Sequence, residues 1–408
     1  MFTLTMRCQE EEPVMTNRLA FLHFCSSVRR EGALAICLAL CTLVLGTSAR
    51  AQGPTFTTFD APGAGTAAGQ GTFGLGINPH GTIAGIYIDA NYAYHGFLRV
   101  KSGNVTTFDA PGAGAGPFQG TFAVGLNLSG SVAGYYADAN NVNHGFVRTP
   151  DGTITTFDAP DAGAASGPGG VAIGDLNQGT FAVNIGPSGA IAGYYRDASN
   201  VTHGFLRTSD GIFTTFDVPG AGNGSFQGTQ TAFFSGLNQA GVIAGYYTDA
   251  SNVVHGLLRT PDGTFTTSDA PGAGTGTGQG TLFGSINPAG ATTGCYLDAD
   301  NISHGLLRTP DGTITTFDAP GAGTAPYQGT LCGNINPAAV ITANYIDTNS
   351  VSHGFVRIAD GTITTFDVPG AGTGSGQGTF PFSNNPAAGI SGNYTDANGV
   401  NHGFLRTP

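Results

Sequence analysis

Seven histidines recur in one short motif, and they are the residues of this chain best suited to chemistry. An Arg follows each of them by four residues, and they are His95, His144, His203, His255, His304, His353 and His402. Imidazoles repeated in this way are candidate metal ligands or general bases. A metal site needs three or four ligands that converge on one ion, whereas equivalent residues of separate repeats are dispersed. We therefore expect each His to make one fixed hydrogen bond near a turn, and each Arg to pair with an Asp of its own or the neighbouring repeat.

A second repeated feature, the Asp-Ala-x-Asn turn, brings several oxygen atoms close together. The turn richest in oxygen contains Asp298, Asp300 and Asn301. Such oxygens could hold calcium, but these turns lack the Gly and the distal Glu of an EF-hand loop. Asp and Asn side chains that bond the backbone of their own turn explain the same residues. The three residues are the first to test for calcium, beside this purely structural interpretation.

Other catalytic patterns are missing from the repeats. The Ala-Pro-Gly-Ala-Gly segments contain Gly-x-Gly, but neither a helix signal nor a Lys follows, which disfavours phosphate binding. No Gly-x-Ser-x-Gly sequence is present for a nucleophile elbow, and no Glu occurs after residue 51 to serve as a glycosidase acid. We expect no cofactor and assign no catalytic residue.

Composition and charge narrow the class of protein. The 408 residues include 67 Gly and 22 Pro but no Trp, and 40% are hydrophobic, which is enough for a core and argues against disorder. After residue 51 the chain has 22 Asp against nine Lys or Arg, and this net charge of −13 disfavours nucleic acid as a partner. Asp without Glu favours turns over helices. We expect many short strands, tight turns and almost no helix.

The first 51 residues have the pattern of a signal peptide or leader. Arg29 and Arg30 precede an apolar run over residues 33–45, and Ala49-Arg50-Ala51 follows as a cleavage site. The apolar run is too short to span a bilayer comfortably. We expect export of the mature chain, to the periplasm, the surface or the exterior of a bacterium, with Met1 or Met15 as the true start.

One unit of about 49 residues is repeated seven times after this segment. A Phe-Asp pair, replaced once by Ser-Asp, ends at Asp60, Asp109, Asp158, Asp217, Asp269, Asp318 and Asp367. A Gln-Gly pair begins at Gln70, Gln119, Gln178, Gln227, Gln279, Gln328 and Gln377. These markers keep step with the His motif. The third unit has ten extra residues between its two markers, and the fourth has three extra residues after Gln227.

Each unit shows four strand patterns separated by turn signals. In the second unit the patterns are residues 121–127, 132–136, 144–148 and 154–158. Asn-Leu-Ser-Gly, Asp-Ala-Asn-Asn and Pro-Asp-Gly turns connect them, and Pro and Gly end the last strand. Three short connections in succession predict a four-stranded antiparallel meander, which is the unit of a propeller blade. An array of separate domains is less favourable, because about 50 residues make a poor independent core.

We predict an all-β fold for residues 52–408, a single seven-bladed β-propeller of four-stranded antiparallel blades. The long Gly-rich connection follows Phe-Asp, so each blade begins at Gln-Gly-Thr and ends with the Phe-Asp strand. This division leaves residues 55–60 without a blade and leaves the last blade, from Gln377 to Pro408, without a fourth strand. We expect the N-terminal strand to pair with residues 402–406 of the last blade and close the ring.

The succession of Gly-Ile-Asn, Ile-Ala-Gly, His-Gly-Phe-Leu-Arg and Asp-Gly-Thr-Ile-Thr-Thr-Phe-Asp over residues 55–408 resembles the bacterial extracellular repeats of the HAF family. That family is named for His-Ala-Phe. Here Gly replaces the Ala in every unit, and Leu replaces the Phe at Leu257 and Leu306. The resemblance implies an exported, propeller-like protein, and it supplies no activity or catalytic residue.

A site present only once should lie where the units differ, because positions needed for folding recur in every unit. The differing residues are Asp161, Asp175 and Asn177 in the ten-residue extension, residues 230–233 in the shorter extension, and His80, Tyr92 and Tyr94 in the first unit. Loops of this kind carry function on rigid scaffolds. Cys295 and Cys332 lie in successive units, so they form either an inter-blade disulfide or two buried thiols.

From these features we predict an exported, non-catalytic propeller that acts as a binding or cell-surface interaction module. The alternative is a carbohydrate-binding lectin with several equivalent pockets between blades, in which Tyr takes the place of Trp. A secreted hydrolase or lyase at the central channel is the third possibility. We expect a monomer whose partner is an extracellular protein or glycan.

Overall fold

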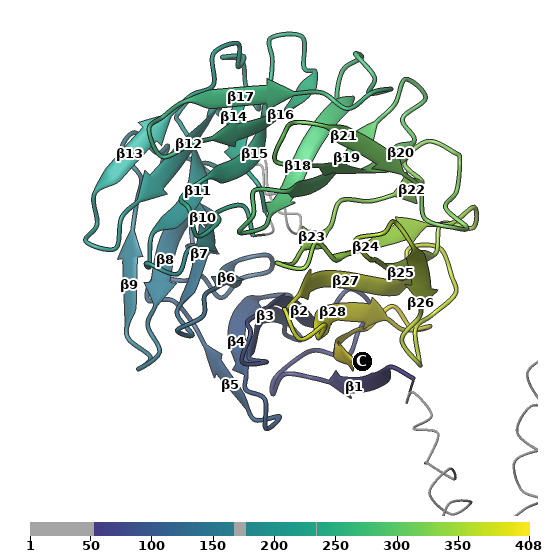
Figure 1. The fold of residues 1–408 in the computed structure, drawn as a ribbon. Helices are drawn as coiled ribbons and strands as arrows, with labels where there is room; N and C mark the ends of the chain where they lie inside the picture. The colour runs from purple at the N-terminus through teal and green to yellow at the C-terminus, as the bar shows by residue number, and fades with distance from the viewer. Residues whose placement is uncertain (1–52, 167–176, 234) are drawn as a thin grey trace, which may run out of the picture. The chain divides into compact units, whose positions relative to one another are not determined.

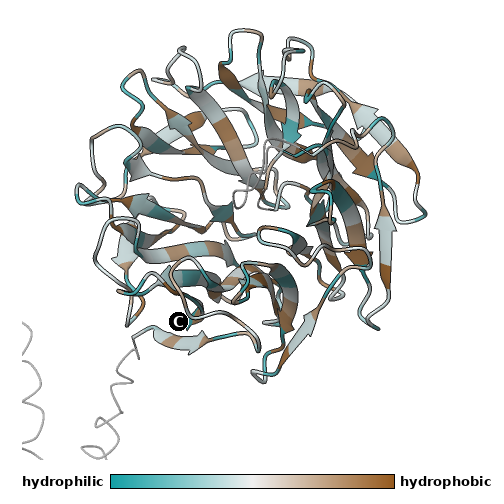
Figure 2. Ribbon diagram, turned by 180° about the vertical axis from the view of Figure 1, so that it is seen from behind, coloured by the Kyte–Doolittle hydropathy of each residue, from teal (hydrophilic) through white to brown (hydrophobic). Residues whose placement is uncertain are grey.

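The computed structural model of this chain describes residues 53–166, 177–233 and 235–408, and Pro54–Pro408 form one compact unit. This unit is a ring of seven four-stranded antiparallel sheets, as predicted, built from strands β1 to β29 (Figure 1). The hydrophobic residues lie mainly on the strands, and the hydrophilic ones mainly in the turns (Figure 2). None of the described residues forms a helix with the length and hydrophobicity of a membrane span.

The two inner strands of each blade lie nearest the axis of the ring. The innermost strands are β2 (Gly71–Ile77), β6 (Gly120–Leu126), β10 (Gly179–Ile185), β14 (Gly228–Thr231), β18 (Gly280–Ile286), β22 (Gly329–Thr330) continued by β23 (Asn334–Ile335), and β27 (Gly378–Asn384). The second strands are β3 (Ile83–Ile88), β7 (Val132–Ala137), β11 (Ile191–Arg196), β15 (Ile243–Thr248), β19 (Thr292–Leu297), β24 (Ile341–Ile346) and β28 (Ile390–Thr395).

The outer half of each blade carries the His and Phe-Asp motifs. The third strands are β4 (Tyr94–Arg99), β8 (Asn143–Arg148), β12 (Thr202–Arg207), β16 (Val254–Arg259), β20 (Ser303–Arg308), β25 (Ser352–Arg357) and β29 (Asn401–Thr407). The outermost strands are β5 (Val105–Phe108), β9 (Ile154–Phe157), β13 (Phe213–Phe216), β17 (Phe265–Ser268), β21 (Ile314–Phe317), β26 (Ile363–Phe366) and β1 (Thr55–Phe59). Blade 1 is thus β2 to β5, and blade 7 is β27 to β29 with β1.

Strand β1 closes the ring, as the sequence predicted. It pairs antiparallel with β29 from Thr55 opposite Thr407 to Phe59 opposite Gly403 (Figure 1). His402 on β29 also lies 3.0 Å from Asp60, which follows β1. The last blade therefore takes its fourth strand from the beginning of the compact unit, and no blade is left with a missing strand.

The Gln-Gly marker is the point at which neighbouring blades touch. Gly120, which begins β6 of blade 2, has a φ of 116° and forms a parallel bridge to Tyr94 on β4 of blade 1. A side chain at Gly120 would collide with the carbonyl oxygen of Tyr94. The positive φ and the close approach together require Gly.

The aromatic side chain of each Phe-Asp pair packs between two blades. The Phe108 ring covers Gly96 of its own blade, where an added Cβ would lie 2.8 Å from the ring. The same ring makes an edge contact with Phe146 of blade 2 at a centroid distance of 6.2 Å. The Gly of the His-Gly motif therefore leaves room for the Phe side chain. That side chain packs between the faces of two neighbouring blades.

Ser268 is the exception to this arrangement, and Phe283 of the following blade compensates for it. At the end of β17, Ser268 replaces the Phe of the other blades. The space over Gly256 is filled instead by the side chain of Phe283, which would lie 2.8 Å from a Cβ added to Gly256. Phe283 on β18 is 1% exposed, and the equivalent residues of blades 2 and 3 are Ala123 and Ala182. Phe283 thus fills the space that Ser268 leaves.

We expect this exchange to appear in a double-mutant cycle. Ser268→Phe should destabilise the protein by about 1–3 kcal/mol through overpacking, and Phe283→Ala by about 3–5 kcal/mol through a cavity. The double variant restores the arrangement of the other blades, so its loss should be clearly smaller than the sum. Urea unfolding of the three variants measures this, and additive losses would contradict the shared space.

A belt of asparagines joins the blades at one mouth of the channel. In the turn after the innermost strand, Asn78 Oδ1 accepts the N–H of Thr82 at 3.0 Å, while its Nδ2 donates to the carbonyl of Asn127 in the next blade at 3.3 Å. Five further inter-blade bonds of this kind run from Asn127, Asn238, Asn287, Asn336 and Asn385, and the last returns to the Asn78 carbonyl. One amide thus caps its own turn and binds the next blade.

The belt is interrupted between blades 3 and 4. Gly186 stands where the other blades have Asn, so it has no side chain to reach Asn238. A cleft of about 410 Å³ opens there, lined by Gly186, Pro187, Leu206 and Leu237 among others.

Gly186→Asn should close the belt and raise the free energy of unfolding by about 1 kcal/mol, the typical gain from one hydrogen bond. Gly186→Ala is the matched control, because it adds a Cβ 3.2 Å from Leu237 Cδ2 without the amide. Urea unfolding compares them. Equal stability of the two variants would show that the missing bond is not the reason for the cleft.

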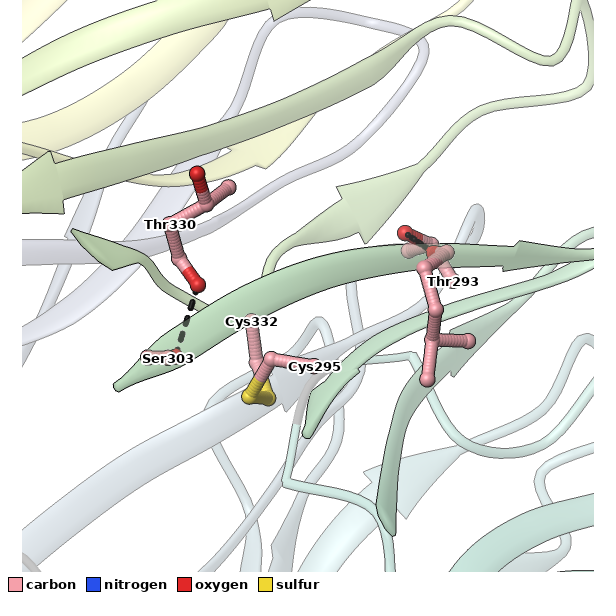
Figure 3. Close-up of a disulfide and its surroundings, with 6 residues drawn as sticks. Thr293, Cys295, Ser303, Thr330 and Cys332 are labelled. Carbon is pink, nitrogen blue, oxygen red and sulfur yellow. Dashed lines mark hydrogen bonds between the residues drawn. A yellow bond between two sulfur atoms is a disulfide. The ribbon is translucent and has the colours of Figure 1, made fainter. Parts of the chain in front are cut away.

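A disulfide joins blades 5 and 6. Cys295 on β19 is bonded to Cys332, which lies between β22 and β23, with a Cα–Cα distance of 4.7 Å. Beside it, Ser303 Oγ donates to the Thr330 carbonyl at 2.7 Å (Figure 3). Of the two arrangements open from the sequence, the structure thus has the inter-blade disulfide.

Candidate functional site

The ring has two ends, which differ in their connections. The linker face carries the Gly-rich linkers between blades and the Asp-Ala-x-Asn turns between second and third strands. The hairpin face carries the turns after the first and third strands. Because the strands alternate in direction, the third-strand His and the Phe-Asp carboxylate lie at the linker face, and the third-strand Arg lies at the hairpin face.

Each repeated His at the linker face lies between two carboxylates. His95 Nδ1 is 3.0 Å from Asp109 Oδ1 on the adjacent outer strand, and its Nε2 is 3.7 Å from Asp89 Oδ2 in the turn. The Tyr87 ring stacks on the imidazole at a centroid distance of 4.7 Å. Each blade repeats the two contacts with Asp. The predicted fixed hydrogen bond is confirmed, and Asp109 and its equivalents are the partners.

These clusters are separate, one to a blade. The described residues contain no group of three or more His, Cys, Asp or Glu side chains placed to hold a metal ion. Each imidazole instead ties its third strand to the outer strand and to the turn.

Contacts between carboxylates and imidazoles shift the pKa of three of the histidines and of six turn carboxylates. The hydrogen bond to Asp109 raises the pKa of His95, and the equivalent bonds raise the pKa of His144 and His203. Partial burial acts to raise the pKa of Asp89, but the backbone N–H groups of Ala93 and Asn91, together with His95, lower it. The pKa values of the other turn carboxylates Asp138, Asp249, Asp298, Asp347 and Asp396 are lowered in the same way.

These shifts predict greatest stability in mildly acidic solution. A raised His pKa contributes stability that is complete below the unfolded value of about 6.5 and is lost as the pH rises through the folded value. A lowered Asp pKa contributes stability present above about pH 4 and lost as the pH falls through the folded value. Urea unfolding across this range should therefore give a maximum between about pH 4 and 6.5.

His95→Asn provides the control for this profile. It removes one titrating imidazole, so the decline of stability above about pH 6.5 should become less steep. Stability that rises steadily from pH 6 to pH 8 would contradict the assignment.

The described residues form two cavities along the central channel. One of about 90 Å³ lies among the innermost strands, and one of about 280 Å³ opens at the hairpin-face mouth, compared with the 300–1,000 Å³ usual for ligand pockets. The extension in blade 4 contributes Phe233 and Ser235 to the wall of the smaller cavity, and Ser235 Oγ accepts a 2.9 Å hydrogen bond from Asn334 Nδ2 of blade 6. The described residues that line the smaller cavity include no titratable side chain.

Two of the three calcium candidates accept hydrogen bonds from groups of their own blade. Asp298 Oδ1 accepts the N–H groups of Asp300 and Ile302 at 2.9 and 2.8 Å. Asn301 Oδ1 accepts a 3.1 Å bond from Gln279 Nε2, and Asp300 is exposed. The turn thus accounts for Asp298 Oδ1, and Gln279, which precedes β18 of the same blade, accounts for Asn301 Oδ1.

The repeated arginines do not pair with Asp, so that prediction was wrong. The Arg148 guanidinium lies over the Phe108 ring of the preceding blade at 5.0 Å. Arg99, Arg207, Arg259, Arg357 and Arg406 cover the Phe-Asp ring of the preceding blade in the same way. Arg308 follows the blade in which Ser268 replaces that Phe. Each of these contacts joins two blades, and a cation over an aromatic face is favourable.

The residues at which the units differ do not form one cluster. His80 lies at the hairpin face, whereas Tyr92 and Asp161 lie at the linker face. Tyr94 begins β4 rather than lying in a loop, and both Tyr94 and Asn177 are 2% exposed. Asp175 lies outside the described residues.

Four aromatic residues at the linker face adopt a left-handed backbone: Tyr92, Phe118, Phe226 and Tyr327. Tyr92 has a φ of 63°, and Phe118 has a φ of 64°. Four other blades have Asn at the position of Tyr92, as at Asn141. At the position of Phe118, three blades have Gly, as at Gly278, and two have the aromatics Phe226 and Tyr327. Gly and Asn adopt this conformation readily, whereas it costs other residues roughly 1–2 kcal/mol. Phe118 was not predicted from the sequence, although an aromatic residue before Gln-Gly was the available signal.

These aromatics flank an apolar pocket between blades 1 and 2, which we call the blade 1–2 pocket. Its volume is about 240 Å³, and Phe73, Ile86, Ile88, Tyr92, Tyr94 and Phe118 line it. The Tyr92 and Phe118 rings lie 6.0 Å apart, and the Phe118 N–H donates to the Tyr92 carbonyl at 2.8 Å. The Tyr92 hydroxyl donates to the Ala68 carbonyl at 3.1 Å, so its ring is held at the edge of the pocket.

No family model and no curated protein sequence matches this chain. Solved structures do resemble it. TolB from Acinetobacter baumannii is 12% identical, with 81% of this chain and 80% of that chain covered and a TM-score of 0.41. The six-bladed fucose-binding lectin of Aleuria aurantia is 13% identical, with 76% and 96% covered and a TM-score of 0.39. A prolyl endopeptidase is 12% identical, with 86% and 50% covered and a TM-score of 0.46. At such identity the likeness concerns the fold alone.

Proposed function

We propose that this chain is an exported, non-catalytic binding module, and that the blade 1–2 pocket is its binding site. The observation that carries this proposal is the pair of left-handed aromatic residues beside an apolar pocket. The inter-blade disulfide supports export, because such bonds persist in oxidising compartments. The resemblance of the repeats to the HAF family agrees with an extracellular location.

Folding alone does not explain why Tyr92 and Phe118 lie side by side. Other blades have Asn, Ser or Gly at the position of Tyr92. The aromatics Phe226 and Tyr327 recur at the position of Phe118, but each of them meets an Asn of the preceding blade and no second aromatic with a left-handed backbone. Phe118 is 37% exposed, so a large part of its ring remains in contact with solvent. Backbone strain that does not serve packing is concentrated at binding sites.

The lining indicates an apolar ligand group. The pocket walls are aromatic and aliphatic, and the Tyr92 hydroxyl already binds a backbone carbonyl. Sugar recognition requires polar groups that bond several hydroxyls, so this pocket favours an apolar side chain of a partner protein over a glycan. A cavity of about 240 Å³ has room for one such side chain.

The uncharged fluorophore N-phenyl-1-naphthylamine tests this proposal. Its fluorescence should rise on binding the wild-type chain and should be lost in the double variant Tyr92→Asn, Phe118→Gly. Both substitutions introduce residues that other blades use, and relief of the left-handed strain offsets lost ring contacts. The free energy of unfolding should therefore stay within about 1 kcal/mol of the wild-type value.

Tyr327→Gly is the matched control. Tyr327 is the residue before Gln-Gly at the interface of blades 5 and 6, outside the pocket, and it also has a positive φ of 64°. This variant should bind the fluorophore as the wild type does. Two results would overturn the assignment. One is that the double variant binds the fluorophore as tightly as the wild type does. The other is that the wild type prefers glycans to the fluorophore and that the double variant still binds those glycans.

A further inference from the structure

The charged residues of the propeller are divided between its two ends. Sixteen described carboxylates lie at the linker face: the seven Asp that follow the outermost strands, the seven Asp that begin the turns between second and third strands, and Asp161 and Asp300. Arg196 is the basic residue of that face within the described part of the chain. The hairpin face has five Asp in its Asp-Gly turns, against seven Arg and Lys101. One end of the ring is therefore strongly acidic and the other slightly basic.

The exposed large hydrophobic side chains are divided in the same way. Three aromatics project at the linker face, with Phe118 37%, Phe226 42% and Tyr327 68% exposed. The large side chains exposed at the hairpin face are aliphatic: Val100, Leu128, Ile212 and Ile358. The acidic end is thus also the aromatic end.

The three aromatics occupy equivalent positions at alternate blade interfaces. Each precedes Gln-Gly and has a φ of 64°, and its N–H donates to the preceding blade, to Tyr92, Asn200 or Asn301 respectively. The rings therefore occur at the interfaces of blades 1 and 2, 3 and 4, and 5 and 6. A partner that spans this face could contact more than one of them.

We propose that the linker face docks a cationic protein segment, whose Lys or Arg side chains lie among the Asp carboxylates and over the exposed aromatic rings. Charge complementarity selects this partner, because an anionic chain would be repelled by sixteen carboxylates. Cations also bind favourably over Phe and Tyr faces, and the chain makes this contact internally where Arg196 lies 5.4 Å from the Phe226 ring. The docking of an apolar residue of the same segment in the blade 1–2 pocket rests on the function proposed above, whereas the charge contacts do not.

A fluorescent deca-lysine peptide tests the proposal with the full chain. Its anisotropy should rise on titration with the protein at neutral pH and low salt, and high salt should weaken binding by about tenfold because the contacts lie near the surface. A deca-glutamate peptide should not bind. Phe226→Gly with Tyr327→Gly removes two rings outside the pocket and should weaken deca-lysine binding by about threefold.

Paired charge variants distinguish the two faces. Asp161→Asn with Asp300→Asn removes two exposed charges at the linker face, and Asp262→Asn with Asp311→Asn removes two at the hairpin face. The first pair should weaken deca-lysine binding by about threefold, and the second should leave it unchanged. Equal effects of the two pairs, or no binding of deca-lysine, would overturn the cationic partner. The fluorophore test is independent of this result, so either proposal can fail while the other stands.

Discussion

The structure depends on the burial of each blade face against the next blade. A sheet of four short strands has no core of its own, and the residues that solve this problem are those that cross from blade to blade. The Phe-Asp ring lies over a glycine of its own blade and against the Phe and Arg of the next, as Phe108 does with Phe146 and Arg148. Where Ser268 replaces this Phe, Phe283 of the next blade packs over Gly256 instead. The space between blades is therefore filled even when the aromatic residue comes from the other blade.

Other contacts hold the ring together at different distances from its axis. The asparagine belt acts near the axis, the disulfide joins blades 5 and 6, and β1 supplies the last outer strand. The His clusters act within each blade, between the turn and the outer strand. The repeated titratable residues thus have structural partners, although their types and repetition first suggested catalysis or metal binding.

The proposed binding site uses side chains that ring closure does not require. Tyr92 replaces the Asn of four other blades, Phe118 replaces the Gly of three, and these two aromatics meet at one apolar pocket. Strand polarity places them at the end that carries most of the carboxylates. A rigid ring can hold such side chains in a strained conformation because the contacts between blades, rather than the turns alone, determine the backbone.

The sequence by itself determined the number of blades, the strand order, the boundary at Gln-Gly and the pairing of β1 with β29. These features follow from local turn and strand preferences, and seven copies make each signal unambiguous. Only the tertiary structure decided that the arginines cover Phe rings, that Asn78 and its equivalents link the blades, and that Phe118 faces Tyr92. Such contacts join residues of different blades, and they depend on the stacking of the sheets and on the sign of φ, which residue type alone does not specify.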